Sequence, residues 1–91
     1  MVINGFIWDD WNAQHIAWHD VAPTEVDEIL RHPWVLTDTH KKTRWQLYGI
    51  TNGNRLIVVI IEPRDNEFYY PITAYDMDYE DREFYTKEVS I

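Results

Sequence analysis

Cysteine is absent from this 91-residue sequence, and glycine and proline are scarce, with three and four residues respectively. Without cysteine the chain can form no disulfide and has no thiol to use as a nucleophile or metal ligand. No apolar run approaches the roughly 20 residues of a membrane-spanning helix, and the N-terminus lacks the basic flank and apolar core of a signal peptide. We therefore expect a cytoplasmic protein that does not enter a membrane.

Positive charge is also scarce, because eight Lys and Arg face 16 Asp and Glu and leave a net charge of −8. Such a balance disfavours nucleic acid as a partner for the chain as a whole. The few cations are unevenly spread, however: residues 34–62 carry four bases and two acids, and every other part of the chain is dominated by acids. These bases either bind a ligand or only solvate a loop and protect a strand edge, and both interpretations stay open.

Hydrophobic residues make up 45% of the sequence and aromatic residues 15%, which favours a packed globule over a disordered chain. A chain of this length has room for one core, so residues 1–91 are expected to form a single domain.

The middle of the chain predicts three antiparallel strands, at Arg44–Thr51, Arg55–Glu62 and Glu67–Tyr75. The turn between the first two strands contains Asn-Gly-Asn, which accepts positive φ angles. The second strand has six consecutive apolar residues, as is typical of a central strand covered on both faces. The third strand contains Pro71, which cannot donate a ladder hydrogen bond, so we expect an edge strand. Its predicted alternation sets Phe68, Tyr70, Ile72 and Ala74 against Tyr69, Thr73 and Tyr75.

Helices are predicted around this sheet. A short strand, Gly5–Trp8, precedes a helix over Trp11–His19 whose N-cap is offered by Asp9-Asp10. One broad face of this helix is interpreted as its packing face, because it carries both tryptophans together with Asn12, His15, Ile16 and His19. A second helix begins at Pro23 and ends at His32, before Pro33. A brief strand at Trp34–Thr37 and a last helix capped by Asp78 complete the pattern. The expected fold is α+β, with β-α-α-β-β-β-α order and the helices on one face of a small twisted antiparallel sheet.

His15 and His19 are four residues apart and share one face of the predicted helix, which is part of a zinc-binding pattern. No third ligand is evident unless His32 or His40 approaches them. The alternative is that both histidines form hydrogen bonds inside an aromatic cluster. We expect no metal and no cofactor, and a metal hydrolase is the least favoured function.

Cleavage of RNA by its own 2′-hydroxyl needs only a base, an acid and cations that stabilise the phosphorane. The residues that could supply these groups are His40, Lys41, Lys42, Arg44, Arg55 and Tyr75. Arg55 follows the hairpin turn and Arg44 lies at the far end of the ladder, so the two need not share a site. Tyr75 ends the third strand near Arg55. Each could equally be structural, Arg55 as a solubilising residue beside a turn and Tyr75 as a cover for the sheet edge.

The order of several short motifs resembles that of BrnT-type toxins. The motifs are FIWDDWNAQHIAWHDVAPTEVDEIL at the N-terminus, the series Arg44, Gly49, Thr51, Gly53 and Arg55 in the middle, and ITAYDMDYEDREFY at the C-terminus. Tyr75 and Ile50 stand where that family often has arginine. The resemblance covers nearly the whole chain. It implies a RelE/ParE-like fold and a ribonuclease toxin of a type II toxin–antitoxin pair, held inactive by an antitoxin protein.

The leading hypothesis is therefore a toxin-like, metal-independent endoribonuclease. Arg55 would stabilise the phosphorane, Tyr75 would act as the acid or stack on a base, and His40 would be the general base. Arg44, Lys41 and Lys42 would bind the RNA backbone. The alternative is a catalytically inactive protein-binding module on the same fold. Its partner would contact four aromatic residues: Trp34, Trp45, Tyr48 and Tyr69.

Overall fold

The computed structural model describes residues 1–41 and 43–90. Lys42, predicted to bind RNA, lies outside the described residues. The elements are β1 (Gly5–Phe6), α1 (Asp10–Ala17), α2 (Pro23–Glu28), a 3-10 turn (Ile29–Arg31), β2 (Val35–Asp38), β3 (Trp45–Ile50), β4 (Leu56–Pro63), a second 3-10 turn (Asp65–Glu67), β5 (Phe68–Asp76) and α3 (Tyr79–Val89). The predicted α+β class is confirmed. The predicted order, β-α-α-β-β-β-α, has one strand too few, because the segment expected only as a brief strand at Trp34–Thr37 forms β2 and belongs to the sheet. Within the described ranges no helix is long and apolar enough to cross a membrane.

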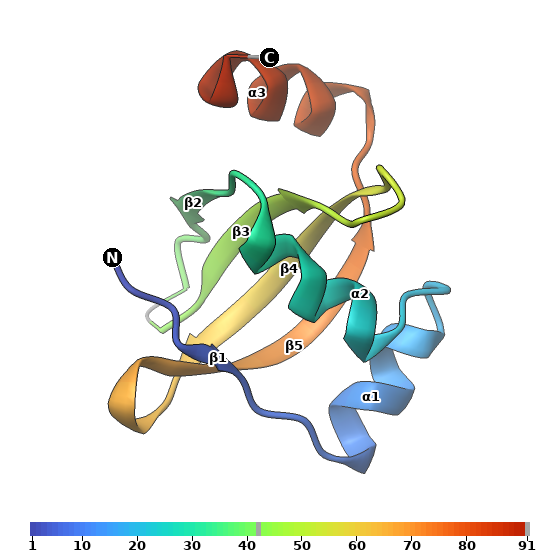
Figure 1. The fold of residues 1–91 in the computed structure, drawn as a ribbon. Helices are drawn as coiled ribbons and strands as arrows, with labels where there is room; N and C mark the ends of the chain where they lie inside the picture. The colour runs from blue at the N-terminus through green and yellow to red at the C-terminus, as the bar shows by residue number, and fades with distance from the viewer. Residues whose placement is uncertain (42, 91) are drawn as a thin grey trace.

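The sheet of the described residues has five strands in the order β1-β5-β4-β3-β2 (Figure 1). Strands β2 to β5 form the expected antiparallel meander. The all-antiparallel expectation was nevertheless wrong, because β1 pairs with β5 in parallel. β5 is therefore not a free edge: Phe68 and Tyr69 pair with β1, and Pro71 lies just beyond that pairing, where no neighbour requires its missing N–H.

A bulge in β5 overturns the predicted alternation of its side chains. Ile61 pairs with Pro71 while Ile60 pairs with Thr73, so Ile72 is an extra residue without its own partner. Beyond the extra residue, the side chains point to the opposite face from the one that strict alternation predicts. Tyr69 and Ala74, predicted on different faces, therefore lie in the same buried cluster. The sequence pattern alone could not reveal this, since Pro71 interrupts the run in either register.

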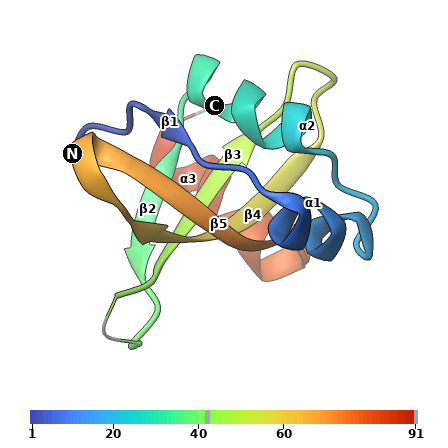
Figure 2. The same cartoon turned by 90° about the horizontal axis from the view of Figure 1, so that it is seen from below.

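Both faces of the sheet are covered, although the helices were expected on one face only. Alternate residues of β4 point to opposite sides: Ile57, Val59 and Ile61 pack with the core residues of α1 and α2, whereas Val58 packs with Tyr48 and with Tyr85 of α3. Figure 2 shows α3 across the sheet from α1 and α2. The central position of β4, predicted from its apolar run, is confirmed.

Capping residues define where the helices begin. The Asp9 carboxylate accepts from Asn12 N–H at 3.0 Å while the Asn12 side chain accepts from Asp9 N–H at 2.9 Å. The hydrogen bond from Asn12 N–H is the largest cause of a lowered pKa of Asp9, and those from the Tyr70 hydroxyl and Trp11 N–H add to it. Asp78 and Asp81 form the same reciprocal pair at the start of α3. Both caps were predicted from the sequence and are confirmed.

The predicted packing face of α1 was right for Asn12 and Ile16 but wrong for the two tryptophans. Asn12 and Ile16 are fully buried, but Trp11 is 57% and Trp18 79% exposed. The buried arc of α1 is narrow because Asn12 donates to the carbonyl oxygens of Ile7 and Pro71 at 3.0 and 3.1 Å. Those two hydrogen bonds set the rotation of the helix against β5, and this rotation leaves both indoles outside.

Candidate functional site

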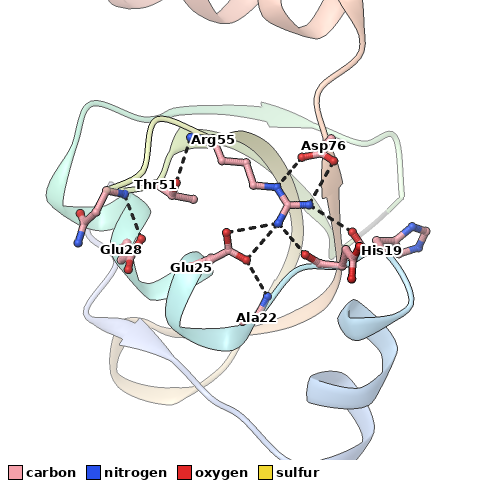
Figure 3. Close-up of polar contacts among 9 residues, drawn as sticks. His19, Ala22, Glu25, Glu28, Thr51, Arg55 and Asp76 are labelled. Carbon is pink, nitrogen blue, oxygen red and sulfur yellow. Dashed lines mark hydrogen bonds and ion pairs between the residues drawn. The ribbon is translucent and has the colours of Figure 1, made fainter.

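Arg55, just before β4, is held by acceptors from three segments that are distant in sequence (Figure 3). Its Nε and Nη2 donate to the two carboxylate oxygens of Asp76 at 2.6 and 3.1 Å. Nη1 donates to the Glu25 carboxylate at 3.1 Å and to the Asp20 carbonyl oxygen at 2.6 Å. Nη2 also donates to the His19 carbonyl oxygen at 3.4 Å. A guanidinium has five N–H donors, so every one of them has an acceptor here.

Through these hydrogen bonds Arg55 joins the segment after α1, the start of α2 and the end of β5 to the central hairpin, so its role is structural. Asp76 and Glu25 raise the pKa of Arg55, the Asp76 hydrogen bond contributing most, and Arg55 in turn lowers the pKa of Asp76. The arrangement leaves no donor directed outward for a phosphate. It also places two carboxylates beside the guanidinium, which opposes an approaching anion.

The neighbouring residues reinforce this end of the hairpin. Thr51 is buried, and its hydroxyl oxygen accepts from Arg55 N–H at 3.1 Å. The Glu28 carboxylate accepts from Asn52 N–H at 3.0 Å, joining α2 to the turn (Figure 3). The positive φ of the turn is taken by Asn54 at 68°, not by Gly53. The turn was predicted correctly, but the residue that adopts the left-handed conformation was not evident.

Arg44 lies at the opposite end of the same hairpin, in different surroundings. Its Nε donates to Glu62 at 2.9 Å, and Arg64 approaches the same carboxylate at 3.6 Å. The Arg44 hydrogen bond is the main cause of the lowered pKa of Glu62. Two cations thus share one carboxylate, and Arg64 also donates to the Pro63 carbonyl oxygen and lies over the Tyr70 ring. Glu62 and Arg64 were not among the predicted site residues, although the predicted hairpin already set Glu62 opposite Arg44.

A hollow of about 250 Å³ adjoins Arg44 on the α3 side of the sheet, where α3 does not reach. Gln46 and Ile60 lie on the sheet face that carries Tyr48 and Val58, so they extend this face beyond the part that α3 covers. The lining residues are Thr39, Lys41, Arg44, Gln46, Ile60, Ile72 and Thr73. The hollow thus combines an apolar floor with hydroxyl, amide and cationic groups, a combination suited to a polar, anionic ligand. A larger hollow of about 540 Å³ is lined by Ile7, Pro63, Arg64, Asp65 and Phe68.

The loop before β3 carries the remaining predicted RNA-binding residues. Lys41 is exposed, and its N–H donates to the Thr39 hydroxyl at 3.1 Å. His40 is exposed in a left-handed conformation, with φ of 68°, and its N–H donates to Asp38 at 2.9 Å. The structure therefore brings His40, Lys41 and Arg44 to one end of the sheet, as the sequence predicted, and separates them from Arg55.

Tyr75 lies at the Arg55 end, as predicted. It is half-buried on the α3 face, and burial raises its pKa, with smaller contributions from Asp81, Tyr48 and Asp78. Its pairing with Val58 is four positions along β4 from Glu62, or roughly 13 Å at the usual rise per residue. Tyr75 and Arg44 therefore do not meet in one catalytic site.

The two histidines of α1 take part in ring contacts. His15 stacks on Trp11 with 5.0 Å between ring centroids, and His19 lies 6.3 Å from Tyr75. Among residues 1–41 and 43–90, no group of three or more His, Cys, Asp or Glu could hold a metal ion.

The predicted partner-binding aromatic residues are placed differently from expectation. Tyr48 and Tyr69 are buried in the two cores, with 8% and 7% of their surface exposed, so they cannot form a docking surface. Trp34 and Trp45 are partly buried against the core of α1 and α2. The strongly exposed tryptophans are Trp11 and Trp18 instead. The spacing of Trp11, His15 and Trp18 indicated that they share one face of the helix. This spacing does not show whether that face is exposed or buried.

Several residues that carry the resemblance to BrnT-type toxins have structural roles. Asn12 is fully buried and links α1 to β5. A Cβ added at Gly49 would lie 2.8 Å from Ile29 Cβ, so the close packing of β3 against the 3-10 turn requires glycine. Arg55 joins the central hairpin to β5, α2 and the segment after α1. These roles explain why those residue types suit those positions, without reference to catalysis.

The structure is thus that of a small α+β protein of strongly acidic composition, in which Lys41 and Arg44 line a hollow on the sheet. Neither the models of known protein families nor the curated proteins compared with this sequence give a match.

Proposed function

We propose that this chain is the toxin-type component of a type II toxin–antitoxin pair, and that it binds and cleaves RNA at the hollow beside Arg44. The observation that carries the proposal is that two cations, Arg44 and Lys41, line this hollow, and that Arg44 shares its one carboxylate partner, Glu62, with Arg64. The motif order that resembles BrnT-type toxins supports the same class and implies an antitoxin as partner.

The proposed reaction is attack of the RNA 2′-oxygen on the adjacent phosphorus, which needs no metal. The bond from phosphorus to the 5′-oxygen breaks, and the leaving 5′-oxygen takes a proton from water to become a 5′-hydroxyl. Arg44 and Lys41 bind the phosphate and stabilise the charge of the phosphorane. His40, on the same exposed loop, takes the proton of the 2′-hydroxyl. Arg55 is reassigned from catalysis to structure, because all of its donors have acceptors within the protein.

Purified protein incubated with RNA in the presence of EDTA tests this proposal. We expect cleavage products that end in a 2′,3′-cyclic phosphate. Replacing Arg44 by Ala should lower the rate by roughly a hundredfold, the usual effect of removing one group that stabilises transition-state charge. Lys87→Ala on α3 is the matched control, since it removes an exposed cation from another element, and it should leave the rate unchanged. RNA that stays intact in an excess of folded protein, or equal losses in the two variants, would contradict the proposal.

The second candidate is a protein-binding module without catalytic activity. It is favoured by the full engagement of Arg55 and by the exposure of Trp11 and Trp18. The RNA experiment separates the two functions, because a module that only binds protein leaves RNA uncleaved.

A further inference from the structure

An aromatic ladder runs along the outer face of α1 and ends on β5. It consists of Trp11, His15, Trp18, His19 and Tyr75. The Trp11 and His15 rings stack at 5.0 Å with an interplanar angle of 10°. His15 then lies 5.1 Å from Trp18 and 6.4 Å from His19, and His19 lies 6.3 Å from Tyr75. Ring contacts therefore continue over two elements that are distant in sequence.

The exposure of the ladder is the feature that packing does not explain. Trp11 is 57% and Trp18 79% exposed. Indole has the largest apolar surface of any side chain, and adjacent exposed aromatic residues are typical of interaction sites rather than of solvated helix faces. A neighbouring strip of the α1 surface already supplies the packing, through the fully buried Asn12 and Ile16.

Carboxylates flank the ladder at both ends. Asp10 precedes Trp11 in the first turn of α1. At the other end the charges of Asp78 and Asp81 act on Tyr75, enough to contribute to its raised pKa. The only basic side chain within α1 is His15, and the chain as a whole carries −8. Stacked rings bordered by carboxylates attract guanidinium and ammonium groups and repel phosphates.

We propose that the aromatic ladder is a docking surface for a basic segment of a partner protein. The arginine and lysine side chains of this segment would stack on Trp11 and Trp18, and their charges would face Asp10 at one end and the Asp78–Asp81 pair at the other. The surface is separate from the hollow beside Arg44, and the proposal holds whether or not the chain cleaves RNA.

A synthetic peptide tests this proposal directly. The probe is a fluorescein-labelled, alanine-rich peptide with four arginines at i, i+4 spacing, and the comparison peptide has glutamate in their place. Fluorescence anisotropy should show binding of the arginine peptide only. Trp18→Ala and Trp11→Ala should each weaken binding by about fivefold or more, the effect of losing one cation–π contact of about 1 kcal/mol. Tyr79→Ala removes an equally exposed aromatic residue, 68% exposed, outside the ladder and should change nothing.

Three results would overturn the proposal. Binding that is equal in the tryptophan variants and in Tyr79→Ala would show general charge attraction. Tighter, tryptophan-dependent binding of a single-stranded RNA oligonucleotide would identify a base-stacking surface. Self-association of the unaltered protein that Trp18→Ala abolishes would assign the ladder to a second copy of the chain. Far-UV circular dichroism should confirm that both tryptophan variants fold, as expected for exposed side chains.

Discussion

Arg44 and Arg55 flank the same β-hairpin but have different surroundings. Arg55 is surrounded by two carboxylates and two backbone carbonyls that use all of its donors. Arg44 shares one carboxylate with Arg64 and borders an open hollow. The role of each arginine depends on the number of acceptors around it and not on its position beside a turn or strand. An arginine whose donors all have acceptors stabilises the fold, whereas one with few acceptors can still bind an anion.

The largest expected difference is between Arg55→Met and Arg44→Met. Arg55→Met should lower the free energy of unfolding by about 2–3 kcal/mol, because it leaves Asp76, Glu25 and two carbonyls without their donor. Arg44→Met should lower it by less than about 1 kcal/mol, since Arg64 remains beside Glu62. Urea denaturation measures both values. Equal losses of unfolding free energy would show that both arginines stabilise the fold to the same extent, which would contradict the proposed difference between them.

A smaller loss of stability is expected when the threonine that forms a hydrogen bond with the backbone of each arginine is replaced by valine. Thr51→Val removes a buried acceptor of Arg55 N–H and should cost about 1–1.5 kcal/mol. Thr39→Val removes the hydroxyl that donates to the Arg44 carbonyl oxygen at 2.9 Å, but water can replace this contact, so less than about 0.5 kcal/mol is expected. Thermal unfolding of the two variants should rank them in this order, and the reverse order would contradict the assigned burial.

The smallest effect is the pH dependence of the Arg55–Asp76 pair. Arg55 lowers the pKa of Asp76 below its ordinary value of 3.8, so the pair contributes stability above about pH 4 and loses it as pH falls through the lower folded-state pKa. Asp76→Asn should therefore cost less than about 1 kcal/mol near neutral pH, and the difference from the unaltered protein should shrink at acid pH. Urea denaturation near pH 7 and near pH 2.5 tests this. A difference that stays constant between these two pH values would show that the carboxylate charge is not what binds Arg55.

Local features of the fold could be predicted from the sequence, because neighbouring residues determine them. Asp9 and Asp78 were identified as N-caps, and the six-residue apolar run identified β4 as central. The division of the candidate residues between two ends of the hairpin also followed from the sequence, since antiparallel pairing and a short turn leave little choice. The prediction failed at long range. The parallel pairing of β1, the bulge at Ile72 and the position of α3 depend on contacts that no local pattern encodes.

The candidate site shows the same limit. The sequence identified Arg44, Lys41 and Arg55 as notable, but it could not tell that Asp76 and Glu25 both bind one arginine while the other shares a single carboxylate with Arg64. It likewise placed Trp11 and Trp18 on one helical face together with Asn12 and Ile16. Burial is decided by the rotation of α1, which the hydrogen bonds from Asn12 to Ile7 and Pro71 set.

By itself the sequence determined the class of the fold, its helix caps and its surplus of negative charge, because these depend on composition and on residues close together in the chain. Only the tertiary structure decided which cation is engaged, which tryptophans are exposed and which face each helix covers. The physical reason is that a charge or an indole acquires its role from the groups within a few ångströms, and in this protein those groups come from segments about 20 to 60 residues away.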